Sequence, residues 1–239
     1  MIARKPSVVT PDRFASGMTF EQYLAYIGTP ENLAREGSLG APRRDWSAHV
    51  RAWYEATRLS DAQVAALRWL ASRPDGPAKV LVISEDWSSD CRRDVPVLAR
   101  MAEAAGFELR IFRRDGQRFS ASPQPSLAEA PDSNADIMAE FLNEKNAQTW
   151  QSIPVAVFYT KNLEYLYRYI EYPGVYHKDR IVGRIRAARP GESQEETRKR
   201  GDREFMELQQ SPLFRVWACA AADEMISALY ERLALGPSP

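Results

Sequence analysis

The chain has 239 residues, of which 44% are hydrophobic and 27% are charged, a balance typical of a folded globular protein. Because 32 Lys and Arg residues offset 32 Asp and Glu residues, no net charge favours nucleic acid or an anionic membrane surface as a partner. No uninterrupted apolar run approaches the length of about 18 residues that a membrane-spanning helix needs. Residues 1–6 are charged and no apolar stretch follows them, so they do not resemble a signal peptide.

The two cysteines, Cys91 and Cys219, lie far apart in the sequence. They cannot form a disulfide framework, and they predict a reducing, cytoplasmic location. Together with His49 and His177 they show no metal-ligand spacing. We therefore expect neither a metal nor an organic cofactor.

The N-terminal part, residues 1–76, is predicted to be helical after an irregular lead-in over residues 1–17. Two of its helices begin with the spacing of a capping box, at Thr19 with Gln22 and at Ser60 with Gln63. Between them, Arg43 to Thr57 carries large apolar side chains along one face, which predicts an amphipathic helix. The turn-forming residues 74–77 end this part.

The pattern changes at Lys79–Ser84, a short and nearly continuous apolar run that predicts a strand buried on both faces. A helix from Ser89 to Ala105 and an alternating strand from Phe107 to Phe112 follow. This order is a βαβ unit, so we expect the two strands to be parallel. Residues 113–134 contain three prolines and no clear period, and they predict a long loop or insertion.

After the insertion we expect a short helix from Asp136 to Lys145, and then an antiparallel hairpin of Val155–Tyr159 and Glu164–Ile170. Helices are predicted over 178–188, 192–209 and 213–235. The last helix carries an apolar stripe that should pack on the core or against a partner subunit, so a homodimer is compatible with it; its residues are Leu213, Val216, Trp217, Leu229 and Leu233. The fold class is α/β, a mixed sheet flanked by helices, with a core over 77–190 between helical extensions at 1–76 and 191–239.

Two segments carry a family resemblance. Trp87–Leu98 resembles the thioredoxin segment Trp-Cys-x-x-Cys, which lies between a buried strand and a helix that a proline kinks five residues later. Trp87 matches, Cys91 falls on the second cysteine and Pro96 on the proline, but Ser88 stands in place of the first cysteine. Ser152-Ile153-Pro154-Val155 is similar to the Ile-Pro turn before the third core strand. The resemblance implies a thioredoxin-like fold over about residues 79–188, with a cis-proline at Pro154 beside the sulfur.

The resemblance implies thiol redox chemistry, although the missing first cysteine removes the attacking nucleophile of dithiol exchange. Val82 stands where the family buries an acidic residue. Our main hypothesis is a monothiol protein that acts through Cys91, with Ser88 supporting the sulfur and with Trp87, Ile153 and Pro154 framing a protein or a low-molecular-weight thiol or disulfide substrate. In the first turn of a helix, Cys91 should have a lowered pKa, which Arg92 and Arg93 could lower further.

Several alternatives stay open. Ser88-x-x-Cys91 is also similar to the Thr-x-x-Cys of peroxiredoxins, but Ser84 replaces the proline expected before it, so a thiol peroxidase is only partly matched. Cys91 is equally well interpreted as a packed remnant. In that case the domain would be a non-catalytic module that grips a peptide or protein partner in a groove between Trp87 and Pro154. The tyrosines of 165–176 predict packing or an aromatic binding wall, and Cys219 predicts a buried structural thiol.

Overall fold

A four-stranded mixed sheet forms the centre of the computed structural model, which describes residues 7–236. The strands follow the order β2-β1-β5-β6: β1 is Lys79–Ser84, β2 Glu108–Arg113, β5 Val155–Tyr159 and β6 Tyr165–Ile170. β1 pairs in parallel with β2 and antiparallel with β5, and β5 pairs antiparallel with β6. The mixed α/β sheet expected from the sequence is confirmed. The charged start of the chain, residues 1–6, lies outside the described residues.

Helix α6, Ser89–Ala105, connects β1 to β2. It begins after Ser88 and ends at Gly106, whose φ of 73° is the left-handed conformation that glycine adopts without a steric penalty. Its side chains Val95, Leu98 and Met101 are buried. Their spacing of three residues places one apolar face on the sheet, as the sequence predicts.

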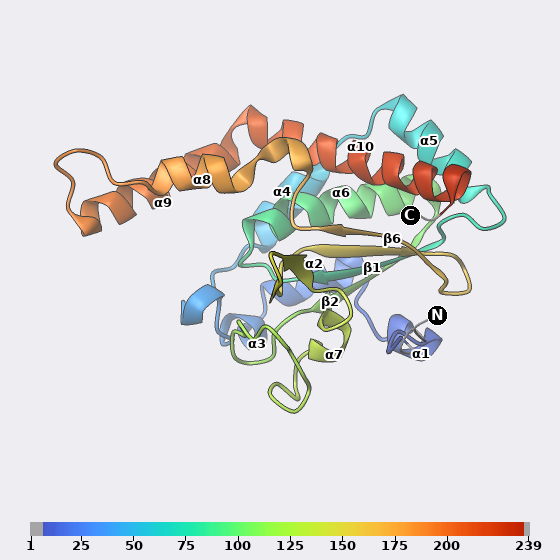
Figure 1. Ribbon diagram of the computed structural model, residues 1–239, viewed down its shortest axis with the longest axis horizontal. Helices are drawn as coiled ribbons and strands as arrows, with labels where there is room; N and C mark the ends of the chain where they lie inside the picture. The colour runs from blue at the N-terminus through green and yellow to red at the C-terminus, as the bar shows by residue number, and fades with distance from the viewer. Residues whose placement is uncertain (1–6, 237–239) are drawn as a thin grey trace.

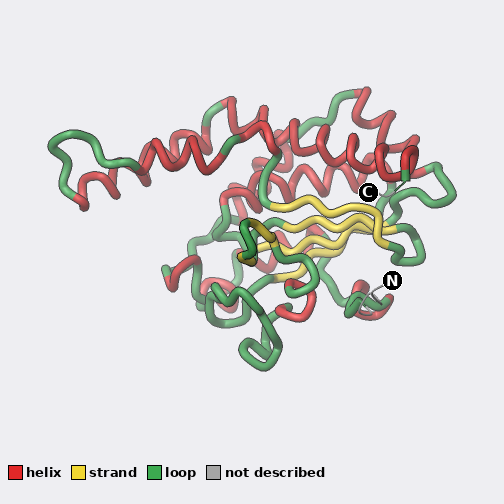
Figure 2. Tube along the Cα trace, viewed as in Figure 1, coloured by secondary structure: helices red, strands yellow, loops and turns green. Residues whose placement is uncertain are grey.

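Helices cover both sides of the sheet (Figures 1 and 2). On the side of α6 lie α4, Ser47–Ala56, α5, Asp61–Ala71, and α10, Pro212–Leu235. The short helices α1, Pro11–Ala15, α3, Pro30–Leu33, and α7, Ala135–Met138, lie on the other side. Helix α2, Phe20–Ile27, packs beside β2, and both predicted capping boxes are present.

The C-terminal helices α8, Lys178–Arg186, and α9, Gln194–Gln210, form an arm that extends away from the sheet (Figure 1). Arg200 joins them, because its guanidinium donates to Glu192 and to the carbonyls of Ile185 and Ala187. Short 3₁₀ helices occur at Ser38–Gly40 and Gly174–Tyr176. None of the helices within residues 7–236 combines the length and apolarity needed to cross a bilayer.

One predicted helix is wrong in its extent. The helix predicted over 136–145 ends at Met138, and Asn143–Lys145 instead pairs as β3 with β4, Gln148–Trp150. The two turn residues between these strands have positive φ values of 54° and 59°, as a tight two-residue hairpin requires. The apolar stripe of α10 packs on the core as expected at Trp217, Leu229 and Leu233. Its first two members, Leu213 and Val216, are 54% and 57% exposed.

Candidate functional site

The residues that resemble a thioredoxin site meet at the carboxyl end of β1. That strand ends at Ser84, and α6 begins with Ser88 as its N-cap. The Ser88 hydroxyl accepts a hydrogen bond from the Cys91 backbone N–H at 3.4 Å. Cys91 therefore lies in the first turn of the helix, as expected, and Ser88 both caps the backbone and lies within hydrogen-bond reach of the sulfur.

Cys91 is buried, with 1% of its surface exposed. Its pKa is raised to about 12, because desolvation by burial outweighs the hydrogen bonds from Ser84, Glu85 and Ser88 that favour the thiolate. The expected lowering of the Cys91 pKa is therefore wrong. The helix N-terminus is present, but burial costs the thiolate more free energy of hydration than its interaction with that terminus contributes.

The two arginines expected to assist Cys91 are engaged elsewhere. Arg92 donates to the carbonyls of Asp86 and Trp87 at 2.8 and 2.9 Å and to Gln209 at 2.9 Å, and its guanidinium lies 3.8 Å from the centre of the Trp46 ring. Burial lowers the Arg92 pKa to about 10. These contacts close the side of the site that faces α4 and α9.

The neighbouring Arg93 is fully buried and pairs with Asp90 at 2.8 Å and with Asp94 at 2.6 Å. Lys178 also pairs with Asp90, which ties the start of α8 to α6. The charge of Arg93 is thus neutralised by carboxylates and does not serve the sulfur.

Ile153 and Pro154 reach the same end of the sheet, because Val155 pairs with Ile83 near the end of β1. The peptide bond between them is cis, and both residues are buried. Trp87 is half-buried: its ring meets Phe119 edge-on at 5.7 Å and faces the Arg114 guanidinium at 5.1 Å. The Trp87 Nε1 has no hydrogen-bond acceptor among residues 7–236.

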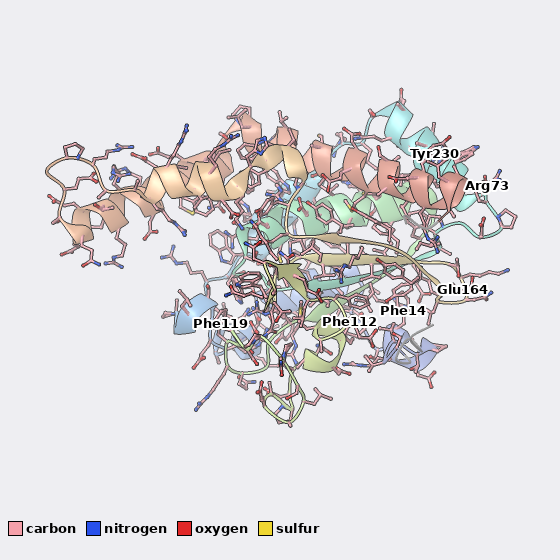
Figure 3. All side chains as sticks on the ribbon, viewed as in Figure 1. Phe14, Arg73, Phe112, Phe119, Glu164 and Tyr230 are labelled. Atoms are coloured by element: carbon pink, nitrogen blue, oxygen red, sulfur yellow. The ribbon has the colours of Figure 1, made fainter. Side chains whose placement is uncertain are left out.

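The insertion bridges the two sides of the expected groove between Trp87 and Pro154. Arg114 donates to the carbonyl of Gln151 at 2.8 Å, and the Gln151 amide donates to the Ser120 hydroxyl at 2.8 Å and to the Ser122 carbonyl at 3.0 Å. In Figure 3, Phe119 lies toward one end of the sheet, and Glu164 and Tyr230 lie toward the other. The chain's own loop therefore lies over this end of the fold.

Sequence reasoning missed a set of charged side chains beside the site, which we call the ionic cluster: Arg35, Arg43, Glu85, Asp86 and Asp115, all buried. Glu85 accepts from Arg35 and Arg43 at 2.7 Å each and from the Asp115 backbone N–H at 2.8 Å. Arg43 also pairs with Asp86. Burial raises the pKa values of Asp86 and Asp115.

A signal for this cluster existed in the sequence. Glu85 and Asp86 directly follow one parallel strand, and Asp115 comes soon after the other. The carboxyl ends of parallel strands meet at one edge of a sheet, where polar side chains commonly gather. What the sequence does not reveal is that Arg35 and Arg43 arrive from the N-terminal helical segment to pair with Glu85 and Asp86, while Arg114 pairs with Asp115.

The remaining candidates are accounted for by packing. The Tyr169 hydroxyl is buried and donates to Asp94 at 2.8 Å, and Tyr176 stacks on Trp217 at 3.9 Å, so these tyrosines belong to the interface with the helices. Cys219 is exposed, and the expectation of a buried thiol is wrong because its face of α10 borders a pocket. Within residues 7–236, no three His, Cys, Asp or Glu side chains gather closely enough to hold a metal ion.

Comparison with known proteins found a family model and two solved structures. A family model described as thioredoxin matches residues 40–131, from the segment before α4 into the insertion. No curated relative matches the chain. Among solved structures, a protein of unknown function from Pseudomonas aeruginosa is 16% identical with a TM-score of 0.48, over 90% of this chain and 93% of the other. An HIV epitope scaffold is 15% identical with a TM-score of 0.46, over 90% and 94%. The family match, together with the mixed sheet and its flanking helices, identifies the core of this chain as a thioredoxin-like domain.

Proposed function

We propose that the thioredoxin-like domain is a non-catalytic binding module and that Cys91 is a packed remnant of a redox site. The observation that supports this most directly is the burial of Cys91, which has 1% of its surface exposed. Thiol exchange requires a thiolate that a second sulfur can approach. The monothiol redox role expected from the sequence stays a prediction, and the burial of its sulfur counts against it.

The magnitude of the pKa also favours binding over chemistry. A thiol with a pKa of about 12 is ionised in only about one molecule in 10⁵ at neutral pH. A thiol near the ordinary value of about 8.5 would be ionised in a few per cent of molecules. The fraction of Cys91 available as thiolate is therefore lower by a factor of about three thousand, before access to the sulfur is considered.

The docking surface we propose is the aromatic rim, which consists of Trp87, Phe119 and Trp150. Trp87 and Phe119 are in edge-on contact and half-exposed, and Trp150 is 42% exposed on the β3–β4 hairpin. Exposed aromatic side chains are favoured at protein interfaces, because they bury a large area at a small entropic cost.

The occupant we propose is a peptide segment of a protein partner. Gln151 and Thr149 already donate to the backbone carbonyls of Ser122 and Pro123, at 3.0 and 2.6 Å. These hydrogen bonds fasten the insertion that carries Phe119 to the β3–β4 hairpin that carries Trp150, so the positions of the two aromatic side chains are fixed relative to each other. The apolar side chains of a peptide would contact the rim.

The chemical half of the proposal is tested by alkylation with iodoacetamide at pH 8, followed at peptide level by mass spectrometry. We expect Cys219 to react in the native protein and Cys91 to react only after unfolding. Modification of native Cys91 at a rate comparable with that of Cys219 would contradict the assignment of Cys91 as a packed remnant.

The binding half is tested by selecting displayed peptides on the intact protein and measuring their affinity for variants. Trp87→Ala and Phe119→Ala should weaken binding at least tenfold, as truncation of an interface anchor does. Trp69→Ala is the matched control, because Trp69 is an exposed tryptophan on α5. Peptides that bind the Trp87 variant as tightly as the native protein would place the docking surface elsewhere.

A further inference from the structure

A cavity lies in the helical layer, outside the thioredoxin-like site. Its volume is about 140 Å³, and it lies where the end of α4 and the turn after it meet α6 and α10. Its lining includes Trp53, Leu59, Val97, Ala218 and Cys219. Within this layer, the Trp53 ring is held in place by a hydrogen bond from its Nε1 to the Arg93 carbonyl at 3.0 Å.

Two arginines complete the lining, Arg58 and Arg215. Neither forms an ion pair with a carboxylate among residues 7–236. Arg58 directs one nitrogen at the carbonyl of Thr57, at 2.9 Å, and Arg215 lies 5.6 Å from the Trp53 ring centre. Both residues are exposed. The pocket thus joins a mainly apolar interior to guanidinium groups that have no anionic partner of their own.

We propose that this pocket binds a small organic carboxylate whose apolar body is one aromatic ring or a chain of about six carbons. An apolar cavity of about 150 Å³ accommodates a benzene ring, so a pocket of this volume limits the body to that size. A carboxylate at the mouth would accept charge-assisted hydrogen bonds from the planar Arg58 and Arg215 guanidinium groups. An apolar interior with few polar groups at its mouth is the usual composition of a small-molecule site.

Cys219 makes the occupancy of this pocket measurable. Its thiol is exposed and belongs to the lining, whereas Cys91 is buried and serves as an internal reference. Burial and the carboxylate of Asp223, which accepts from Gln63 at 2.7 Å, raise the Cys219 pKa. Alkylation at pH 8.5 increases the fraction of Cys219 present as thiolate.

The experiment measures the rate of Cys219 alkylation by iodoacetamide in the full-length protein with and without 20 mM benzoate or hexanoate. A ligand of about nine heavy atoms has a Kd on the order of 1 mM, so 20 mM should slow the reaction more than tenfold. Benzamide and hexanamide have the same bodies without the charge. They should protect Cys219 at least fivefold less well.

Substitutions in and beside the pocket test whether the carboxylates protect Cys219 by binding there. Ala56→Leu adds bulk at an exposed lining residue and should abolish protection, while Ala52→Leu, an exposed residue one turn earlier on α4 and outside the lining, should not. The double variant Arg58→Gln and Arg215→Gln should raise the carboxylate concentration needed for half-protection at least fivefold. Arg51→Gln, also exposed on α4, should leave it unchanged.

The proposal fails if neither carboxylate slows Cys219 alkylation at 20 mM. It fails equally if the neutral amides protect Cys219 as well as the acids do. It also fails if the carboxylates protect Cys219 in Ala56→Leu and in the arginine variant as well as they do in the native protein. Thermal melting of each variant verifies that the fold is retained, and the conservative exposed substitutions keep the result interpretable.

Discussion

Replacing Glu85 by Gln should destabilise the protein strongly, although the side chain keeps its size. The Glu85 carboxylate is the shared partner of two buried guanidinium groups, from Arg35 and Arg43, each at 2.7 Å. Gln retains one oxygen but presents an NH₂ group to the second arginine, so buried positive charge is left without its anion. Removing one partner of a buried ion pair costs about 3–5 kcal/mol. We expect the lower end, about 3 kcal/mol, because the neutral amide still accepts one hydrogen bond.

Urea unfolding followed by circular dichroism measures this loss. With a slope of about 1–3 kcal/mol per molar urea, the midpoint should fall by at least about 1 M. Because the ionic cluster ends beside Cys91, the site should also open more often, and Cys91 alkylation below the unfolding transition should accelerate about 100-fold. Glu144→Gln is the control, since Glu144 is exposed on β3. A Glu85→Gln protein that unfolds at the same midpoint as this control would show that the ionic cluster does not hold the fold.

Three further predictions concern single side chains. Relative to Cys91→Ala, the native protein should lose about 1.4 kcal/mol of stability per pH unit above about pH 9. Because the pKa of Cys91 in the folded protein is raised to about 12, only the unfolded state ionises this thiol just above about pH 9. If the difference in free energy of unfolding between the two proteins, measured with urea, does not change with pH, the prediction is contradicted. Leu229→Ala should lower the free energy of unfolding by about 2–5 kcal/mol, because Leu229 is buried. Val216→Ala should change it by no more than about 0.5 kcal/mol, because Val216 is exposed. Equal losses for the two variants would refute the orientation of α10. Ser88→Cys should form a disulfide with Cys91 under mild oxidation, yet reduce insulin little above background, and free-thiol counts with an insulin assay test both statements.

Much of the fold follows from local patterns in the sequence. The bounds of β1, α6 and β5 match their predicted ranges, because each is a long or uniformly apolar segment flanked by clear turn or cap residues. The β3–β4 hairpin does not follow from such a pattern. Its strands are only three residues long, mostly exposed and charged or polar, so no apolar alternation reports them.

The candidate site was located but not described correctly by sequence. The family resemblance placed Cys91 at the start of a helix after a buried strand, and the structure has it there. Its neighbour Arg92 is held by residues distant in sequence, through the ring of Trp46 and a hydrogen bond to Gln209. Contacts of this kind are set by tertiary packing, and a single sequence without its relatives carries no pattern for them.

The balance of magnitudes at Cys91 explains why a familiar rule gives the wrong sign here. A helix N-terminus stabilises a negative charge by about 0.3–1 kcal/mol, and by about 2 kcal/mol at most. The rise of the Cys91 pKa from 9.0 to about 12 corresponds to roughly 4 kcal/mol in the opposite direction. Burial therefore outweighs the dipole. Under the proposed function, exchange at Cys91 requires this end of the sheet to open first, so we expect that a cysteine restored at Ser88 forms its disulfide and still leaves the protein a poor reductant of insulin.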